Sequence, residues 1–446
     1  MNLKRTLIEI KGDGKTFYIL GLPNSKCFSF LVRCNMGGNS EEKFKKLTQR
    51  NIFGLSHLVE HLSFKSPKDY TTDDFIKELR DKGIYNAMTN NNYNMYYHQS
   101  IMEHYKTSVD LVLNAALNDL SRVTEEEFVI ERKVVSNEAK MYNSNVDNKF
   151  RRNAARQLTG QHIENDVIGL SETIDNFSLE DAKELKANFL NYSDTSYHIT
   201  YDPLEMEIGV ITKYILSKLN EFKKPKVFVN LYETYIKDIK KYSLKNTVEK
   251  IESKSTQAQN VLAFKFTDNI TPKDYINLDF LIGYLNRYAP NKSLDYIIRE
   301  KHGLTYNVSL YQDFGSSLNE SIVYLVCGVT KGDEDKLIDL FKETLNLNNR
   351  EFNFEDYRKY LKSKELKSII GKLDQEYYDI YHDYPFHGTS LFKDNEELFA
   401  QDLDTVDLKL MEKYVDEDSV RSVLNKICSL INKQSYSLIQ SIDVKE

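Results

Sequence analysis

A chain of 446 residues is too long for one ordinary hydrophobic core, so we expect two domains. Hydrophobic residues make up 41% of the chain, which is enough to fill such cores and speaks against a disordered protein. The net charge is −7 and the basic residues are scattered, so we expect no nucleic-acid partner, which would need a concentrated basic face.

The chain also lacks the apolar segments that a membrane requires. Its longest apolar stretch, residues 321–329, has the length of a buried strand and falls short of the roughly 18 residues of a spanning helix. No apolar stretch of a secretory signal follows the basic N-terminal residues. The four cysteines include no CxxC pair and no metal-ligand spacing. We therefore expect a reduced, cytoplasmic protein without a membrane span.

Strands and helices can be predicted in order from the N-terminus. Alternating apolar stretches predict strands at 15–20 and 28–34. The Lys-rich segment 39–51 is mostly polar and predicts a loop or an exposed helix. Residues 54–64 (GLSHLVEHLSF) predict a helix, and residues 71–83 predict another, with an N-cap threonine, early acids and a terminal glycine.

A hairpin and a long helix follow. Residues 84–101 alternate around an Asn-rich centre and predict a β-hairpin. Thr124 and Glu127 have the spacing of a capping box. They predict the start of a long helix that runs through residue 143 and beyond.

The second half of the chain repeats this order. Residues 124–142 resemble 349–369, and residues 171–191 resemble 395–415, at similar offsets. Such offsets indicate an internal duplication, although unrelated helices of similar polarity are the alternative. The two halves would meet in the charged segment 220–246.

These patterns predict an α+β fold of two homologous domains. Each domain would be a mixed or antiparallel sheet flanked by helices. We expect the N-terminal domain to cover residues 1–222 and the C-terminal domain to cover residues 223–446.

The helix at 54–64 carries His57, Glu60 and His61. Residues four apart share a helical face, so both imidazoles can bind one metal ion, and Glu60 can contact a water beside it. This H-x-x-E-H order is the inverted form of a zinc-peptidase motif. The alternative is two ordinary helix histidines. However, the helix is otherwise apolar, and three ionisable groups there would be costly unless they are paired or bind a metal. We therefore predict a zinc site, with one ion per chain.

A third ligand must come from another part of the chain. The helix that Thr124 opens contains Glu131 and Glu138, which are seven residues apart and share one helical face. Either side chain could reach a metal, and their spacing does not choose between them.

A family resemblance bears on that choice. Residues 54–65 resemble the active-site helix of the pitrilysin and insulin-degrading-enzyme family of zinc metallopeptidases, which includes the mitochondrial processing peptidase. Residues 130–140 (IERKVVSNEAK) resemble that family's downstream helix. The resemblance implies that Glu138 is the third zinc ligand and that Glu131 supports the site without binding the metal. Against the family pattern, residues 39–51 look like an insertion.

The same resemblance suggests substrate-contacting residues. Residues 86–89 (NAMT) resemble the strand against which the family lays its substrate, so Asn86 and Ala87 would contact a peptide that adds as a strand. Residues 299–308 (REKHGLTYNV) resemble a segment that faces the zinc. Arg299 and Tyr306 would contact the substrate backbone, and Tyr306 would stabilise the oxyanion. Taken alone, these two could be a helix-end arginine and a strand tyrosine.

The resemblance implies a zinc metalloendopeptidase that forms half of a clamshell. Two chains would enclose a chamber for unfolded peptides, such as leader or precursor peptides. Arg299 and Tyr306 would act in trans, in a homodimer or in a heterodimer with a related subunit. Glu60 would take a proton from the attacking water and return it to the leaving amine. The alternative is a non-catalytic structural or peptide-binding subunit of the same fold.

Overall fold

The computed structural model describes most residues between 6 and 442. Outside its description are residues 1–5, 13–14, 35–36, 39–40, 42–51, 91–92, 160–166, 188–194, 223–246, 253–256, 268–270, 315–320, 331, 364–413 and 443–446. The described residues form two compact units. Unit 1 holds those up to Tyr142 and those from 167 to 222, and unit 2 holds 143–159 and those from 247 onward. Most of the expected linker 220–246 lies outside the described residues, and the boundary at 222/223 stays a prediction.

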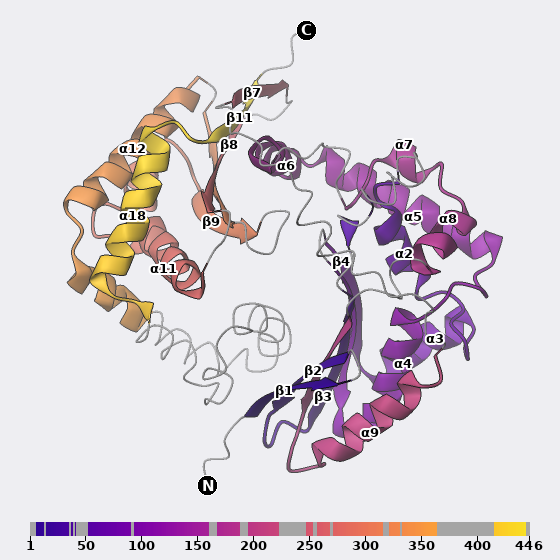
Figure 1. Ribbon diagram of the computed structural model, residues 1–446. Helices are drawn as coiled ribbons and strands as arrows, with labels where there is room; N and C mark the ends of the chain where they lie inside the picture. Colours follow the sequence, from indigo (N-terminus) through magenta and orange to yellow (C-terminus); the bar gives the residue numbers. More distant parts are fainter. Residues whose placement is uncertain are drawn as a thin grey trace. The chain divides into compact units, whose positions relative to one another are not determined.

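Unit 1 contains a six-stranded sheet (Figure 1). Its strands are β1 (Thr6–Gly12), β2 (Lys15–Gly21), β3 (Cys27–Cys34), β4 (Ile84–Thr89), β5 (Asn94–Ile101) and β6 (Thr195–Tyr201). They lie in the order β1-β2-β6-β3-β5-β4; β2 and β6 run parallel and the other pairs are antiparallel. The last strand in sequence therefore lies in the middle of the sheet, and β4 lies at an edge. The predicted strands at 15–20 and 28–34 and the predicted hairpin at 84–101 are confirmed.

Helices cover one face of this sheet and extend beyond it. The helices of unit 1 are α2 (Leu55–Leu62), α3 (Thr72–Lys82), the short η1 (Met102–His104), α4 (Tyr105–Ala116), α5 (Glu125–Ser144), α7 (Ser171–Ile174), α8 (Leu179–Leu185) and α9 (Ile208–Leu219). The helices predicted at 54–64 and 71–83 are confirmed as α2 and α3. As predicted, α3 has an N-cap threonine, because the Thr71 hydroxyl accepts the Asp74 N–H at 3.2 Å.

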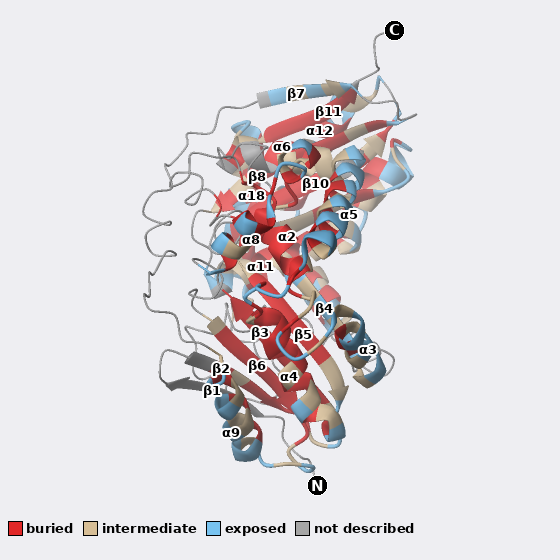
Figure 2. Ribbon diagram, turned by 90° about the vertical axis from the view of Figure 1, so that its right-hand side faces the viewer, coloured by how far each residue is buried: buried red, intermediate tan, exposed pale blue. Residues whose placement is uncertain are grey.

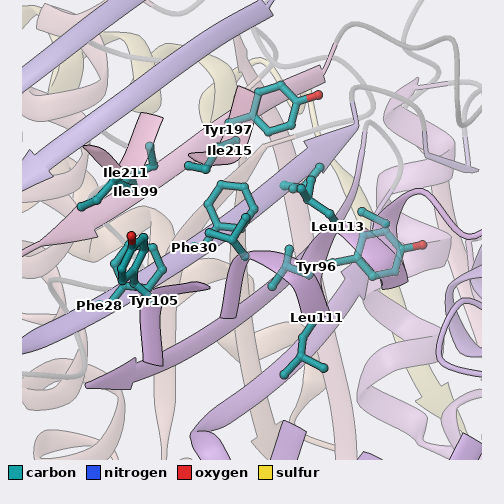
Figure 3. Close-up of a cluster of buried hydrophobic side chains, with 14 of the residues drawn as sticks. Phe28, Phe30, Tyr96, Tyr105, Leu111, Leu113, Tyr197, Ile199, Ile211 and Ile215 are labelled. Carbon is teal, nitrogen blue, oxygen red and sulfur yellow. The ribbon is translucent and has the colours of Figure 1, made fainter. Parts of the chain in front are cut away.

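The core of unit 1 lies between the sheet and α4 and α9. β3 and β6 are buried along almost their whole length (Figure 2). Phe28 and Phe30 point from β3 into an apolar cluster that includes Tyr96 of β5, Leu113 of α4 and Ile215 of α9 (Figure 3). Alternate residues of a strand share a face, so the two phenylalanines anchor the helices to the same side of the sheet.

The long helix predicted to start at Thr124 is confirmed as α5. The capping box is confirmed, since the Thr124 N–H donates to the Glu127 carboxylate at 2.9 Å and the Glu127 N–H donates to the Thr124 hydroxyl at 3.2 Å. The helix ends at Ser144, and α6 (Val146–Thr159) begins after Asn145. The Asn145 side chain accepts the Asn148 N–H at 3.0 Å and thereby caps α6. This cap separates two helices whose polar sequences run on without a glycine or proline.

Unit 2 repeats the topology of unit 1. Its sheet has the order β7-β11-β8-β10-β9, with β7 and β11 parallel and the other pairs antiparallel. Its strands are β7 (Thr247–Glu252), β8 (Ala258–Thr267), β9 (Val308–Phe314), β10 (Ser321–Val329) and β11 (Ser437–Ile442). This order matches β2-β6-β3-β5-β4 of unit 1: β11 lies between β7 and β8, as β6 lies between β2 and β3, and β1 is an additional strand of unit 1. Two α+β units with the same strand order confirm the predicted fold class and agree with an internal duplication.

Helices flank this second sheet as well. The helices of unit 2 are α6, α11 (Pro272–Gly283), η4 (Tyr284–Tyr288), η5 (Asp295–Lys301), α12 (Glu334–Arg350) and α18 (Glu417–Asn432). α6 precedes the expected domain boundary in sequence, yet its Phe150, Ala154 and Leu158 pack in the unit 2 core with Val261 of β8 and Ile439 of β11. Across the described parts of the chain, no helix is both long and apolar enough to cross a membrane.

Candidate metal centre

α2 carries three ionisable side chains on a largely apolar helix. Its leucine and valine residues, Leu55, Leu58, Val59 and Leu62, lie in a buried cluster together with residues of α5, α7 and α8. His57 and Glu60 are 7% and 8% exposed, and His61 is half-buried. The apolar side chains therefore hold the helix in the core of unit 1. The two histidines and the glutamate are not needed for this packing and can bind a ligand or transfer a proton.

α5 packs beside α2 and brings both candidate glutamates to the histidines. Glu138 Oε2 lies 3.8 Å from His57 Nε2 and 3.5 Å from His61 Nε2. Glu131 contacts the other side of the His61 ring, with its Oε2 3.2 Å from Nδ1. Lys65 Nζ lies 2.7 Å from the second oxygen of Glu131. The two glutamates therefore have different positions: Glu138 between the imidazoles and Glu131 behind one of them.

The donor atoms of His57, His61 and Glu138 suit a divalent metal ion. These atoms lie within 4.8 Å of one another, and no other described histidine, cysteine or acidic residues form such a group of three. Ligand atoms around a tetrahedral zinc are about 3.3 Å apart, given zinc–nitrogen distances near 2.0–2.1 Å. Because Glu131 holds Nδ1 of His61, Nε2 of that ring is left for the metal.

The electrostatics of the group favour a cation. Burial alone would lower the pKa of His61, but hydrogen bonds with Glu131 and Glu138 and the Glu60 charge raise it to about 9. The hydrogen bond with His61 lowers the pKa of Glu138. Burial would raise the pKa of Glu131, but His61 and Lys65 outweigh it and lower that pKa. Two carboxylates thus hold a positive charge between them, as carboxylate ligands of a metal ion would.

Glu60 lies in a different environment from the other two glutamates. Burial raises the pKa of its carboxyl above the ordinary value, and a hydrogen bond from Thr89 offsets only part of this shift. The Thr89 hydroxyl lies 2.6 Å from Glu60 Oε2. Asn94 Nδ2 donates to the same hydroxyl at 2.7 Å and to the Ser56 carbonyl at 3.4 Å. Thr89 ends the NAMT stretch at 86–89, but the sequence did not predict a contact of Thr89 or Asn94 with Glu60.

The N-terminal end of α2 is capped by a residue from outside the helix. Glu41 is fully buried, and its carboxylate accepts the Gly54 N–H at 3.1 Å and the Ser56 N–H at 2.5 Å. A carboxylate at this end satisfies free N–H groups and complements the helix dipole. For Glu41, the prediction that 39–51 is a loop or exposed helix is therefore wrong about exposure; most of that segment lies outside the described residues.

The start of α2 also requires glycine. Gly54 has φ of 95°, in the left-handed region, and an added Cβ would lie 2.9 Å from Gly169 Cα. Any side chain at residue 54 would therefore push the turn at 169 away from the beginning of the helix.

A buried lysine supports the C-terminal end of α2. Lys186 Nζ donates to the Ser63 hydroxyl at 3.1 Å and to the Ala116 carbonyl at 2.9 Å. The Ser63 hydroxyl donates to the Val59 carbonyl of α2 at 2.7 Å, and Asn118 donates to the Ser63 carbonyl at 3.1 Å. Burial lowers the pKa of Lys186 to about 8. A positive charge near a helix C-terminus complements the dipole, so both ends of α2 are held by charged groups from distant parts of the sequence.

The predicted substrate residues of unit 1 lie on the edge strand. Asn86 is exposed on β4, and Ala87 is half-buried. Within the described sheet, β4 pairs with β5 on one side only, which leaves its other edge with backbone groups that can take a further strand. The side chain of Asn86 accepts the N–H of Ala87 at 2.9 Å.

Arg299 and Tyr306 lie in unit 2 and contact each other there. The Arg299 guanidinium lies 5.5 Å from the centre of the Tyr306 ring, and its Nη1 lies 3.3 Å from Asp295 Oδ1. The Tyr306 side chain is 84% exposed and precedes β9, the unit 2 counterpart of β4 in strand order. The pair is therefore available to an external partner.

Two family models match the chain. Residues 48–169 match the model described as "Insulinase (Peptidase family M16)", and residues 207–362 match "Peptidase M16 inactive domain". The two matches together cover more than half of the chain. The first contains the H-x-x-E-H motif, and the second contains no such motif.

Relatives of known sequence carry a zinc protease description. The chain is 25% identical over 299 residues to an "Uncharacterized zinc protease" of Rickettsia felis, covering 65% of this chain and 66% of that protein. A protein of Rickettsia bellii with the same description is 23% identical over 299 residues, covering 64% of this chain and 65% of that protein. The chain thus spans just under two thirds of the length of each relative.

Solved structures share the fold. A protease from Helicobacter pylori superposes with a TM-score of 0.72 and 16% identity, over 98% of this chain and 100% of that one. The periplasmic protease PqqL from Escherichia coli superposes with a TM-score of 0.71 and 13% identity, over 98% of this chain and 48% of that one. Pitrilysin superposes with a TM-score of 0.68 and 16% identity, over 99% of this chain and 45% of that one. The chain therefore has about half the length of the last two.

Proposed function

Because the chain belongs to the M16 family of peptidases, we propose that it is a zinc metalloendopeptidase that cleaves unfolded peptides. The observation that carries the proposal is the convergence of His57, His61 and Glu138 beside Glu60. These are three potential ligands and a carboxylate that is placed for proton transfer. The second half of the chain has no counterpart of the H-x-x-E-H motif, so we propose one zinc per chain.

The residues of the site have distinct roles in this proposal. Nε2 of His57, Nε2 of His61 and the carboxylate of Glu138 would hold the zinc, and Glu131 would orient His61. A zinc ion bound there supplies Lewis-acid polarisation of the scissile carbonyl and of the attacking water. Glu60 takes the proton of that water and delivers it to the leaving amine. Burial raises the pKa of this carboxyl above its ordinary value, which makes it a stronger base for the first of these steps.

The edge strand supports an unfolded peptide as the substrate. A peptide that adds to the open edge of β4 forms main-chain hydrogen bonds, which place few demands on its sequence. A folded domain does not offer a free strand of this kind. Asn86 and Ala87 would contact the bound peptide, and leader or precursor peptides fit this requirement.

Metal dependence tests the proposal directly. The purified protein is expected to contain about one zinc per chain and to cleave an unfolded peptide mixture such as a casein digest. Chelation with 1,10-phenanthroline should stop cleavage, and added zinc should restore it. A compact folded domain in the same reaction should stay intact. Cleavage by metal-free protein would contradict the proposal. Zinc-loaded protein that binds peptides and never cuts them would favour the alternative, a non-catalytic peptide-binding subunit.

The length of the chain supports a paired assembly. Because it covers 48% of PqqL and 45% of pitrilysin, we propose that two chains together form the working enzyme. In this homodimer, Arg299 and Tyr306 of one chain contact the peptide at the zinc of the other. A heterodimer with a related subunit is the alternative.

Mixing two inactive variants tests this arrangement. Glu60→Gln chains keep Arg299 and Tyr306, and Arg299→Ala chains keep the zinc site. Equal mixing, with exchange of chains, is expected to restore about a quarter of the natural activity, because half the dimers are mixed and each of these has one complete site. Activity that stays at the sum of the separate variants after mixing, in a preparation shown to exchange chains, would contradict action in trans.

A further inference from the structure

Thr89 connects the edge strand to the carboxylate of Glu60. It is the last residue of β4, and its hydroxyl lies 2.6 Å from Glu60 Oε2 on α2. The contact joins residues 29 positions apart in sequence and two elements with separate roles. β4 offers the open edge of the sheet, and α2 carries the histidines of the metal centre.

The direction of this hydrogen bond is set by a second contact. Asn94 Nδ2 lies 2.7 Å from the Thr89 oxygen, and an amide nitrogen can only donate. The single proton of the hydroxyl is therefore directed to Glu60. Asn94 is fully buried and also donates to the Ser56 carbonyl at 3.4 Å, one residue before His57. The hydroxyl is thus oriented by a group that has little freedom to move.

The hydrogen bond from Thr89 to Oε2 of Glu60 also fixes the position of the second carboxylate oxygen, Oε1. A glutamate has three rotatable side-chain bonds, and a free carboxylate on a helix would sample several orientations. Because Thr89 contacts Oε2, Oε1 is the oxygen left with both of its lone pairs for proton transfer. The carboxyl is only 8% exposed, and little bulk water competes for the contact.

We propose that Thr89 is the positioning residue of the general base, an inference that rests on the proposed peptidase function. Thr89 fixes the carboxylate of Glu60 in the orientation used for proton transfer. It also connects that base, on α2, with β4, the strand along which the peptide would be bound. Neither the H-x-x-E-H motif nor the metal-ligand geometry requires this residue.

Two substitutions at residue 89 test the role. Thr89→Val keeps the shape and the strand preference and removes the hydroxyl, whereas Thr89→Ser keeps the hydroxyl. We expect Thr89→Val to lower kcat by about 10- to 100-fold, the range seen when a supporting hydrogen bond is removed, with KM and zinc content unchanged. Thr89→Ser should restore kcat to within about 3-fold of the natural protein, since the donor is back in place.

A matched control uses the same change away from the site. The Thr72 hydroxyl donates to the carboxylate of Glu127, and neither residue belongs to the group formed by His57, Glu60, His61 and Glu138. Thr72→Val should leave kcat unchanged whatever it does to the melting temperature. If Thr89→Val has the natural kcat, loses zinc, or changes KM alone, the positioning role is wrong. If the natural protein itself cleaves no peptide, the proposed function fails instead, and the two failures remain distinct.

Discussion

Replacing Glu60 with glutamine is expected to abolish peptide cleavage and to leave the zinc in place. Glutamine has nearly the same shape and can still accept the Thr89 hydrogen bond, but its amide cannot take up a proton. General-base catalysis contributes about 10²- to 10⁴-fold, so we expect kcat to fall by at least that factor. Burial already raises the pKa of Glu60, which means that its charge is costly in the fold. The neutral variant should therefore be no less stable than the natural protein.

The measurement combines three readings on the same samples. Cleavage of the unfolded peptide mixture, zinc content and melting temperature should be compared for the natural protein, Glu60→Gln and Glu126→Gln. Glu126 is an exposed acid on α5, so its variant controls for the loss of one negative charge. Full activity in Glu60→Gln would show that another group takes the proton. Loss of zinc in this variant would mean that Glu60 helps to hold the metal.

The second large effect separates the two glutamates of α5. Glu138→Gln is expected to lose zinc, because its carboxylate lies between Nε2 of His57 and Nε2 of His61. Glu131→Gln removes a partner of Nδ1 of His61, on the far side of the ring. Such supporting contacts are worth about 10- to 100-fold in metal affinity. We therefore expect both variants to bind zinc more weakly, with the larger loss in Glu138→Gln.

Competition with a chromogenic chelator at fixed pH measures this order. The natural protein and both variants should be titrated side by side, with circular dichroism to confirm that each is folded. A larger loss in Glu131→Gln would exchange the roles assigned to the two residues. Equal zinc affinities of the natural protein and both variants would show that neither glutamate of α5 contributes to zinc binding.

The elements of unit 1 could be predicted largely because their signals are local. The N-cap of α3, the capping box at Thr124 and the alternation of residues 84–101 involve residues within one or two turns of one another. No end was predicted for the helix that Thr124 opens. Asn145 caps α6 with its side chain, and asparagine inside a polar helix gives no clear signal of such a break.

The supports of the site could not be predicted, for a different reason. Glu41 precedes α2 in sequence and Lys186 follows it by more than a hundred residues, yet both contact its ends. In the sequence, each is a charged residue with no sign that it is buried. Sequence spacing likewise left Glu131 and Glu138 equivalent, since residues seven apart share a helical face. Only the position of α5 along α2 distinguishes them, and that position follows from how the apolar side chains of the two helices pack.

The central position of β6 bears on when the proposed metal centre can form during synthesis. All the proposed ligands have been made once residue 138 emerges, but β2 and β3 are joined in the sheet only by β6, at residues 195–201. α2 has eight residues and is too short to persist alone, and Lys186 joins it only shortly before β6. The helix can therefore be held at both ends only after residue 186 has been made, shortly before β6 itself. We therefore expect binding of the proposed metal ion and closure of the N-terminal unit to occur together, late in the folding of that unit.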